Sequence, residues 1–544
     1  MITDLKINEA RKARYYEQGY WTHQTIGDVW DQRISLSSAD TYVQDDRGST
    51  FTYSEVDDQA GRLAAWLVAQ GIVPGDVVTF QMPTWAEFTI VYVACLKAGT
   101  VMHPLPIDFT TDDLIYGMNL VGSKAFLCPT VFEGRDLEAQ AMTAANKIPS
   151  LVGLAFIDRQ GPSPAGNPTL SSITASFEPI TTKPAVTSDD AVCILATSGS
   201  TGKPKAALFT HNTILFSERS FVKGVNRTQS DVMFMPSPLN HATGFFHGLI
   251  SPMILGGRTV LQQKFDAEAA VDLVNDEGCT WSMGATPFIF DILNELERTD
   301  KKLSTLQVFL CGGAPVPGHM VQWAHKHGVA LAEIYGSTES CPHIFVPPHL
   351  CFAWDGAWSG IPFEGIEVRV VDEQRNEVPC GVQGEEASRG PHQFVGYLND
   401  PKRTAAALDD DGWFYSGDLC YRDDEGRIRI NGRKKEIIIR GGENISAIEV
   451  DEHIAGCPGI GDHASIGMPD ERLGERVCTF AVPTGDTQPT LEEVSAYLAA
   501  KGVRGRLHPE RIEYIDAIPR TATGKIRRFL LLEEIARRRQ GEED

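Results

Sequence analysis

Basic charge is scarce in this chain. Its 49 lysine and arginine residues are outnumbered by 72 aspartate and glutamate residues, which gives a formal net charge of −23 at pH 7. A phosphate backbone needs a basic surface, so this balance argues against nucleic acid as a partner. It does not exclude a small anion, which a few local lysines can hold. The acidity itself most simply favours solubility.

Cysteine motifs, internal repeats and long apolar runs are missing as well. The 11 cysteines are scattered singly, without a C-x-x-C pair or a Cys/His cluster, which favours free thiols in a reducing compartment over disulfides or zinc. No apolar run approaches the roughly 18 residues that span a bilayer, and residues 88–96 instead predict a buried helix. The charged N-terminus does not read as a signal peptide, and the C-terminal QGEED is no peroxisomal signal. We therefore expect a cytoplasmic protein without a transmembrane segment.

What the chain does contain is an alternation of helical and strand-like segments. Residues 53–72 carry apolar side chains at helical spacing, residues 75–82 read as a strand and residues 85–100 as the next helix. This alternation predicts an α/β fold with layered helices and parallel sheet. At 544 residues the chain is too long for one core. A charged joint at 432–435 separates the predicted domains, a large N-terminal one of several subdomains (1–432) and a small α+β one (433–544).

A loop rich in glycine and hydroxyl residues, TSGSTGKPK, follows the apolar run AVCILA. Its small residues let backbone N–H groups approach a phosphate, and its lysines add positive charge. The glycine spacing and the proline after the first lysine exclude a P-loop. A flexible turn is the plain alternative. The candidate phosphate-binding residues are Thr197, Ser198, Gly199, Ser200, Thr201, Gly202, Lys203 and Lys205.

The stretch EIYGSTES combines groups that suit a nucleotide. Tyr335 offers a flat face for a base, Thr338 a hydroxyl for a phosphate and Glu339 a hard oxygen ligand for Mg²⁺. A strand that ends in an exposed turn is the plain alternative. Just upstream, the glycines of LCGGAPVP (Gly312 and Gly313) could let the backbone approach a planar ring or could form an ordinary turn.

Three further stretches carry single residues of interest. In YSGDL, Asp418 has two acceptor oxygens for the two hydroxyls of a ribose, which Arg433 could also contact, although Asp418 could equally cap a helix. In PRTATGKIRR, Lys525 is the mobile point charge that phosphoryl transfer needs, or a solvated lysine before a basic helix. In SPLNHATGFFHG, His241 precedes an apolar run and is either a core histidine ahead of a buried helix or the mouth of an apolar substrate pocket.

Together and in this order, these stretches resemble the adenylate-forming superfamily of acyl- and aryl-CoA synthetases, peptide-synthetase adenylation domains and beetle luciferase. The resemblance rests on TSGSTGKPK, YGSTE, YSGDL, GRKKEIIIRGGENI and PRTATGKI and covers nearly the whole chain. It implies that a carboxylate attacks the α-phosphorus of ATP, which releases pyrophosphate and forms an acyl-adenylate. A thiol then displaces AMP to give a thioester. The implied cofactors are ATP, Mg²⁺ and coenzyme A.

The resemblance also implies a role for each motif. The phosphate loop holds the β- and γ-phosphates, Thr338 the α-phosphate and Glu339 the Mg²⁺, while Lys525 bridges the attacking carboxylate and the phosphate oxygens. Rotation of a mobile C-terminal domain about Lys435 exchanges Lys525 for the thiol path. His241 swings to admit the carboxylate. The remaining implied contacts are those to adenine (Gly312, Gly313, Ala314, Tyr335 and Gly336), to ribose (Asp418 and Arg433) and to the entering thiol (Gly441 and Gly442).

An apolar acid is the expected substrate. Relatives that activate amino acids keep an aspartate near LNHATGFFHG, which this chain lacks, and no carrier domain follows the PRTATGKI motif, so CoA is the expected thiol. A short- to medium-chain fatty acid comes first and a cyclohexanecarboxylate or aryl acid second. A stand-alone ligase for an acyl carrier protein and a non-catalytic nucleotide-binding relative remain alternatives, and a homodimer is possible. The pocket candidates are mostly apolar or small: His241, Gly244, Phe245, Gly248, Ala285, Thr286, Gly336 and Cys341.

Overall fold

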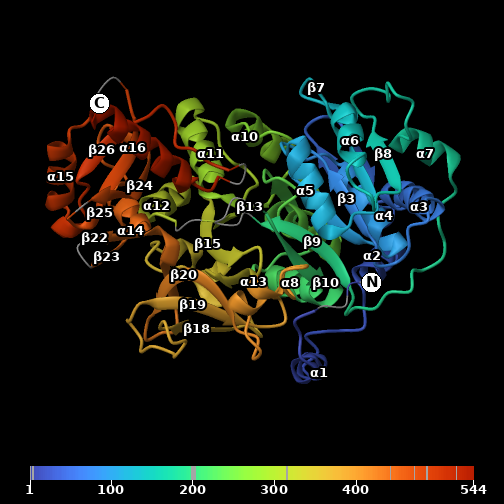
Figure 1. The fold of residues 1–544 in the computed structure, drawn as a ribbon, viewed down its shortest axis with the longest axis horizontal. Coiled ribbons are helices and arrows are strands. Elements are labelled where there is room, and N and C mark those ends of the chain that lie inside the picture. Colours follow the sequence, from blue (N-terminus) through green and yellow to red (C-terminus); the bar gives the residue numbers. More distant parts are fainter. Residues whose placement is uncertain are drawn as a thin grey trace.

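Two parts of unequal size make up the protein. The computed structural model describes residues 2, 5–197, 204–313, 316–440, 443–470, 472–485, 488–521 and 524–543. The larger N-terminal part is built on three sheets of nine, six and four strands, and the C-terminal part on one five-stranded sheet. In Figure 1 the six-stranded sheet and its helices lie at the right, the four-stranded sheet at the bottom and the C-terminal part at the upper left. The predicted α/β class is confirmed.

The nine-stranded sheet has a parallel centre and antiparallel edges. Strands β1, β12, β11, β13, β14 and β15 run parallel, while β2 at one edge and β16 and β17 at the other run antiparallel to their neighbours. The ends of β13, β14 and β15 supply several candidate site residues. In sheet order the strands are β17 (Ile361–Pro362), β16 (Cys341–Phe345), β15 (Ala330–Ser337), β14 (Val308–Gly312), β13 (Trp281–Ala285), β11 (Val232–Met235), β12 (Arg258–Leu261), β1 (Thr41–Asp45) and β2 (Thr50–Thr52).

The six-stranded sheet packs against helices that are buried on nearly every side. Helix α4 (Glu87–Ala98) contains the predicted buried segment, and all but one of its residues are buried. One hydrophobic cluster continues from this sheet into the nine-stranded sheet, which joins the two into a common core. In sheet order the strands are β10 (Lys205–Thr210), β9 (Ala191–Thr197), β4 (Val101–Leu105), β3 (Val77–Gln81), β5 (Ala125–Pro129) and β8 (Gly153–Ile157); only β10 is antiparallel.

The four-stranded sheet is wholly antiparallel and leads to the C-terminal part. Its strands are β18 (Glu367–Val371), β19 (Gly384–Arg389), β20 (Phe414–Arg422) and β21 (Ile428–Arg433). A single 3₁₀ turn, η3 (Lys434–Glu436), connects β21 to the next sheet. A separate two-stranded ribbon is formed by β6 (Val131–Phe132) and β7 (Arg135–Asp136).

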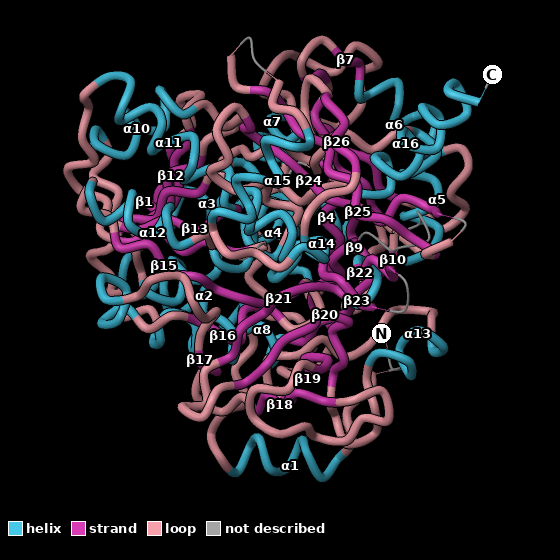
Figure 2. The backbone as a smooth tube through the Cα atoms, turned by 90° about the vertical axis from the view of Figure 1, so that its left-hand side faces the viewer, coloured by secondary structure: helices cyan, strands magenta, loops and turns pink. Residues whose placement is uncertain are grey.

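Residues 437–543, called the C-terminal unit below, form the second part. Two hydrophobic clusters lie in this unit, one with α14 and α15 and the other with α16. Figure 2 shows β22 and β23 of this unit beside β20 and β21, where the two parts meet. The strands are β22 (Ile437–Arg440), β23 (Glu443–Ser446), β24 (Ile460–Asp470), β25 (Gly474–Pro483) and β26 (Arg511–Tyr514), and the helices are α14 (Ala447–Ile454), α15 (Leu491–Ala500), η4 (Gly505–Leu507) and α16 (Arg528–Glu543).

Polar contacts hold the two parts in this arrangement. The Arg429 guanidinium on β21 donates to Glu452 on α14 at 2.7 Å. The hydroxyl of Ser446, which also caps α14, donates to the backbone carbonyl of Asn431 at 2.6 Å. Because both contacts join residues on opposite sides of the connection, they depend on the relative orientation of the two parts.

The remaining helices cover the sheets of the N-terminal part. Helix α3 begins at the predicted residue and carries a Thr52–Glu55 capping box. No helix of the described residues is both long and apolar enough to cross a membrane. The helices are α1 (Glu9–Glu17), α2 (Ile26–Ser37), α3 (Tyr53–Ala69), α5 (Thr111–Val121), α6 (Leu137–Ala145), α7 (Leu170–Ser176), α8 (His211–Gly224), η1 (Thr243–Ile250), α9 (Ser251–Leu255), α10 (Ala267–Asp276), α11 (Thr286–Thr299), α12 (Gly318–Lys326), η2 (Pro348–Ala353) and α13 (Pro401–Ala407).

Two local interpretations differ from the structure. Asp418 lies inside β20, so the helix-cap alternative is wrong; the bulge beside it lets the strand turn this carboxylate toward Arg433. The apolar run after His241 forms a π-helix, η1, where an ordinary buried helix was expected. A π-helix shifts side chains by one residue relative to an α-helix, which periodicity alone does not reveal.

Candidate active site

A tight hairpin between β15 and β16 presents Tyr335, Thr338 and Glu339. A Cβ atom at Gly336 would lie 1.9 Å from the carbonyl oxygen of Cys341, so only glycine lets the strands approach this closely. The hydroxyls of Ser337 and Ser340 lie 3.1 Å apart and shape the turn. Tyr335 is therefore fixed in the strand, while Thr338 and Glu339 lie in the turn.

Glu339 is a buried carboxylate with two polar partners on its Oε1 atom. Lys205, the first residue of β10, donates to it at 3.2 Å, and the hydroxyl of Tyr397 donates at 2.7 Å. Lys205 also donates to the Tyr397 hydroxyl at 2.7 Å, and its Nζ lies 4.2 Å from the centre of that ring. Burial opposes ionisation of Glu339, but Lys205 and Tyr397 outweigh it and lower the pKa of Glu339. The carboxylate is thus held ionised, as a cation ligand must be.

Asp418 and Arg433 face each other across neighbouring strands. They are partners in the register of β20 and β21, and Arg433 Nε lies 2.7 Å from Asp418 Oδ1. The Tyr335 hydroxyl donates to Asp418 Oδ2 at 2.8 Å. The charge of Asp418 raises the pKa of Arg433, while burial and the same carboxylate hold the pKa of Tyr335 far above its usual value. The predicted base-binding and ribose-binding residues therefore form one connected group.

Behind this group lies a buried pair that the sequence motifs do not include. Glu386 and His343 are fully buried, and His343 Nε2 lies 3.1 Å from Glu386 Oε1. His343 Nδ1 lies 3.2 Å from the carbonyl oxygen of Cys341, so both ring nitrogens face acceptors. The other oxygen of Glu386 lies 3.3 Å from the Tyr335 hydroxyl oxygen. The pair thus supports Tyr335 from the interior.

Lys525 extends from the C-terminal unit toward the end of β14 in the N-terminal part. A Cβ atom placed on Gly313, at the end of β14, would lie 4.0 Å from Cε of Lys525. Crowding by protein atoms and then the charge of Arg433 lower the pKa of Lys525, and the carboxylates of Asp418 and Glu339 partly offset this. Three predicted groups from separate motifs are therefore within electrostatic reach of this lysine.

His241 lies within electrostatic reach of Lys525. Burial, followed by the positive charge of Lys525, lowers the pKa of His241 to about 4. The imidazole is therefore neutral at pH 7. Gly524, next to Lys525, packs against the end of β13. A Cβ atom placed on Gly524 would lie 3.2 Å from the Cβ of Ala285. Thr286 begins the next helix and lies 3.2 Å from the Cys311 thiol.

The other pocket candidates serve close packing in this structure. Cβ atoms at Gly244 and Gly248 would lie 2.1 Å from the carbonyl oxygen of Pro238 and 2.8 Å from Cγ of Met235, respectively. Gly248 therefore lets the π-helix approach β11, and Gly244 lets it approach the loop that follows β11. The remaining two candidates are enclosed: Phe245 packs against Phe88 and Tyr92 in the core, and Cys341 is buried at the hairpin. Their role in acid binding stays a prediction.

Several predicted residues lie outside the described part of the chain. They include most of the phosphate loop, one adenine candidate and the proposed thiol path: Ser198, Gly199, Ser200, Thr201, Gly202, Lys203, Ala314, Gly441, Gly442 and the side chain of Lys435. The ends of the phosphate loop are described: Thr197 ends β9 and is buried, and Lys205 begins β10.

Comparison with known proteins gives the family. The model of the AMP-binding enzyme family matches residues 31–398, and that of the AMP-binding enzyme C-terminal domain matches residues 449–525. The chain belongs to the AMP-binding enzyme family. This AMP-binding enzyme is 41% identical over 539 residues to a medium-chain fatty-acid–CoA ligase of Escherichia coli, covering 99% of the chain and 95% of that relative.

Two further relatives show how widely the similarity extends. A feruloyl-CoA synthase of an Amycolatopsis species is 30% identical over 504 residues, which is 93% of the chain and 98% of the relative. ATP-bound MatB of Rhodopseudomonas palustris has a TM-score of 0.84 at 26% identity, with 94% of this chain and 99% of that one covered. The predicted resemblance to adenylate-forming enzymes, the fold with a large N-terminal and a smaller C-terminal domain, and the class of AMP-forming acid ligase are confirmed.

Proposed function

We propose that this AMP-binding enzyme converts a medium-chain fatty acid, ATP and CoA into the acyl-CoA, AMP and pyrophosphate. The observation that supports this most is the convergence of Lys525 on Glu339 and Asp418, which belong to separate motifs and come together only in the fold. The choice of acid rests on the 41% identity to the medium-chain ligase. Binding of ATP and of CoA is a property of the family.

The first half-reaction follows from the charged groups around Lys525. A carboxylate oxygen of the fatty acid attacks the α-phosphorus, and the bond from that phosphorus to the bridging oxygen of pyrophosphate breaks. Lys525 offsets the negative charge that the carboxylate and the phosphate oxygens bring together. Asp418 accepts hydrogen bonds from the ribose hydroxyls and Tyr335 lies against the base. Because His241 is neutral, it forms no ion pair with the carboxylate of the acid, which stays free to approach the phosphorus.

One protein carboxylate is enough to bind the proposed Mg²⁺ ion when ATP supplies further ligands. Mg²⁺ retains several waters and is commonly held by one or two carboxylates together with substrate phosphates. Glu339 fits this role, since it is ionised and both of its neighbours, Lys205 and Tyr397, contact the same oxygen. Among the described residues there is no group of three potential metal ligands, as a site held by protein alone would need. Mg²⁺ would neutralise phosphate charge there.

In the second half-reaction, the CoA thiol attacks the acyl carbonyl and AMP leaves. We infer that the C-terminal domain, which the sequence predicts to begin at residue 433, rotates about Lys435 between the two half-reactions. The hydrogen bonds of Arg429 with Glu452 and of Ser446 with Asn431 join the two parts through polar groups, which suits an interface that opens. A cytoplasmic location and a homodimer are further parts of this proposal.

An aryl acid is the second candidate substrate. The feruloyl-CoA synthase named above covers almost the same length of chain, so the fold accommodates both kinds of acid. The discriminating experiment measures pyrophosphate release and thioester formation with C2 to C16 fatty acids, cyclohexanecarboxylate, benzoate and ferulate. The highest kcat/KM should fall on C6 to C12 acids. A preference for an aryl acid would overturn the choice of acid, and transfer to acyl carrier protein but not to CoA would overturn the choice of thiol.

A further inference from the structure

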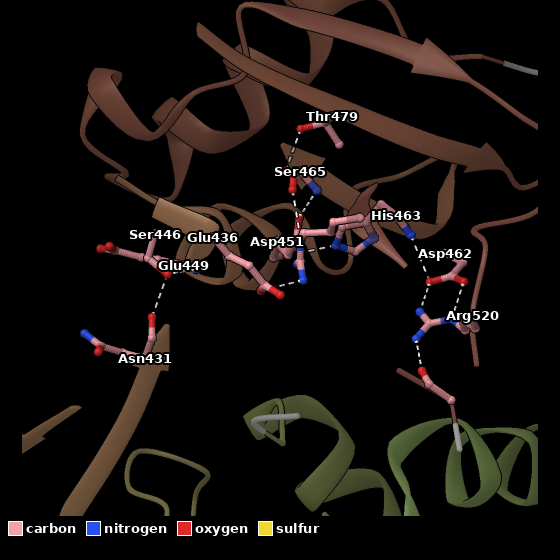
Figure 3. Close-up of polar contacts among 12 residues, drawn as sticks. Asn431, Glu436, Ser446, Glu449, Asp451, Asp462, His463, Ser465, Thr479 and Arg520 are labelled. Atoms are coloured by element: carbon pink, nitrogen blue, oxygen red, sulfur yellow. Dashed lines mark hydrogen bonds and ion pairs between the residues drawn. The ribbon is translucent and has the colours of Figure 1, made fainter. Parts of the chain in front are cut away.

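One arginine, three residues beyond Lys525, holds three elements of the C-terminal unit together. Arg528 begins α16, and its side chain is only 13% exposed. Its Nη2 donates to Asp451 on α14 at 2.5 Å and its Nε to the carbonyl oxygen of Ser465 on β24 at 3.0 Å. Its Nη1 donates to Glu436 at 2.9 Å. Figure 3 shows these three partners side by side, each on a different element.

The partners of Arg528 are themselves fixed. The second carboxylate oxygen of Asp451 accepts from the backbone N–H of Ser465 at 2.6 Å, and its carbonyl oxygen lies 2.8 Å from His463 Nε2. The Ser465 hydroxyl lies 2.8 Å from that of Thr479 on β25 (Figure 3). Glu436 differs from the other partners, because it is the last residue of the turn η3 that connects the two parts.

Hydrogen bonds join the residues before Lys525 to those after it. Thr521 N–H donates to the carbonyl oxygen of Lys525 at 2.9 Å, and Arg527 N–H donates to that of Pro519 at 2.8 Å. Arg520 pairs through two nitrogens with Asp462 and donates to the carbonyl oxygen of Gly524 at 2.7 Å. These hydrogen bonds link the described residues on the two sides of Lys525, called the loop below, and Arg528 connects them directly to the turn between the parts.

We propose that Arg528 is a positioning residue. Through its ion pair with Glu436, it sets the position of Lys525 relative to Glu339 and Asp418. The proposal rests on the function proposed above. Glu436 lies one residue past Lys435, so a rotation about Lys435 carries Glu436, Arg528 and the loop as one body. Without the pair, the turn and the loop are linked only through the body of the C-terminal unit. Lys525 would then spend less time at the α-phosphate.

This role predicts an effect on one half-reaction only. Acyl-adenylate formation needs the charge of Lys525 in place, and misplacement of a catalytic group by about 1 Å lowers rates up to about 100-fold. Thiolysis of a preformed acyl-adenylate does not use Lys525. A purely structural role would instead reduce both halves in proportion to the fraction of folded enzyme.

The test uses full-length E436A, E436Q, R528K and D451N, with R537Q as the control. Arg537 lies on the same helix as Arg528, but its side chain is 73% exposed and pairs with Glu534 one turn away. Octanoate-dependent exchange of pyrophosphate into ATP measures adenylation, and CoA thioester formation from synthetic octanoyl-AMP measures thiolysis. Denaturation midpoints report folding.

We expect E436A to lower exchange about 10- to 100-fold with thiolysis within twofold and an unchanged midpoint. E436Q, which keeps an acceptor, should lie between E436A and the wild type, and R528K should retain part of the exchange. D451N should lower the midpoint, since it removes a partner inside the unit. Equal losses of pyrophosphate exchange and of thiolysis in E436A, or no loss of either, would overturn this inference. The proposed function would still stand, because the wild type would be active. A wild type that exchanges no pyrophosphate would overturn the proposed function and this inference together.

Discussion

Tyr397 offers the sharpest single-atom perturbation of the site. An isolated bridge between Tyr397 and Ala207 places the tyrosine beside β10, and its hydroxyl lies between Glu339 and Lys205 at 2.7 Å from each. Tyr397→Phe removes this oxygen only. The ring keeps its packing against Phe394 and its position next to the Lys205 ammonium.

The size of the effect follows from the lost hydrogen bonds. A hydrogen bond to a charged group contributes about 1.5–3 kcal/mol, and the direct Lys205–Glu339 contact at 3.2 Å remains as partial compensation. If about 2 kcal/mol is lost in the transition state, the adenylation rate falls about 30-fold. The hydroxyl also helps to lower the pKa of Glu339, so the acidic limb of the pH–rate profile should move to higher pH in the variant.

Tyr415→Phe is a closely matched control. Tyr415 is as buried as Tyr397, at 7% exposure, and its hydroxyl also bridges a carboxylate, Asp409, and a cation, Arg369, at 2.9 Å each. Its side chain packs in a separate cluster with Trp413. Both variants should lose similar free energy of unfolding, but only Tyr397→Phe should lose octanoate-dependent pyrophosphate exchange. The reasoning is refuted if Tyr397→Phe stays within twofold of the wild type or if Tyr415→Phe loses as much activity.

Two further variants test other parts of the account. Burial, partly opposed by Arg429, raises the pKa of Glu333 to about 7, so the native protein binds a proton that the unfolded chain releases above about pH 4.5. The free energy of unfolding should therefore fall by up to ~3 kcal/mol between about pH 4.5 and pH 7, and Glu333→Gln should flatten this decline in chemical denaturation; an equally steep decline would contradict the assignment. Glu386→Gln should weaken the support of Tyr335 and raise KM for ATP about 3- to 10-fold with little change in kcat. A lowered kcat at unchanged KM would place Glu386 in the chemical step instead.

The sequence predicted the elements whose residues are selected by burial alone. Continuous apolar runs identified strands such as β3 and β5, and uniform burial identified α4. The family resemblance of the motifs assigned Tyr335, Asp418 and Lys525 to one nucleotide site, and their roles there stay a prediction. The structure joins Tyr335 to Asp418 and brings Lys525 within electrostatic reach of Asp418. The antiparallel four-stranded sheet was not anticipated, since its strands are only half buried and alternate weakly.

Residues outside the motifs could not be recognised from the sequence. Tyr397 and Glu386 lie 58 and 43 positions away from their partners Glu339 and His343, and only the folded sheets bring them together. The sequence GEEAS at residues 384–388 contains no apolar run, so the burial of Glu386 in β19 is evident only in the folded sheet. The glycines of the π-helix were assigned to a pocket for their small size, whereas their Cβ positions show that backbone packing also requires them.

The placement of Lys525 is the central claim, and adenylation without it is the most direct measurement. In Lys525→Ala and Lys525→Gln, octanoate-dependent pyrophosphate exchange should fall at least about 10²- to 10³-fold, because the charge that offsets the reacting anions is gone. The Kd for ATP and the thiolysis of octanoyl-AMP should stay within a few-fold of the wild type. Exchange at the wild-type rate in either variant would contradict the account.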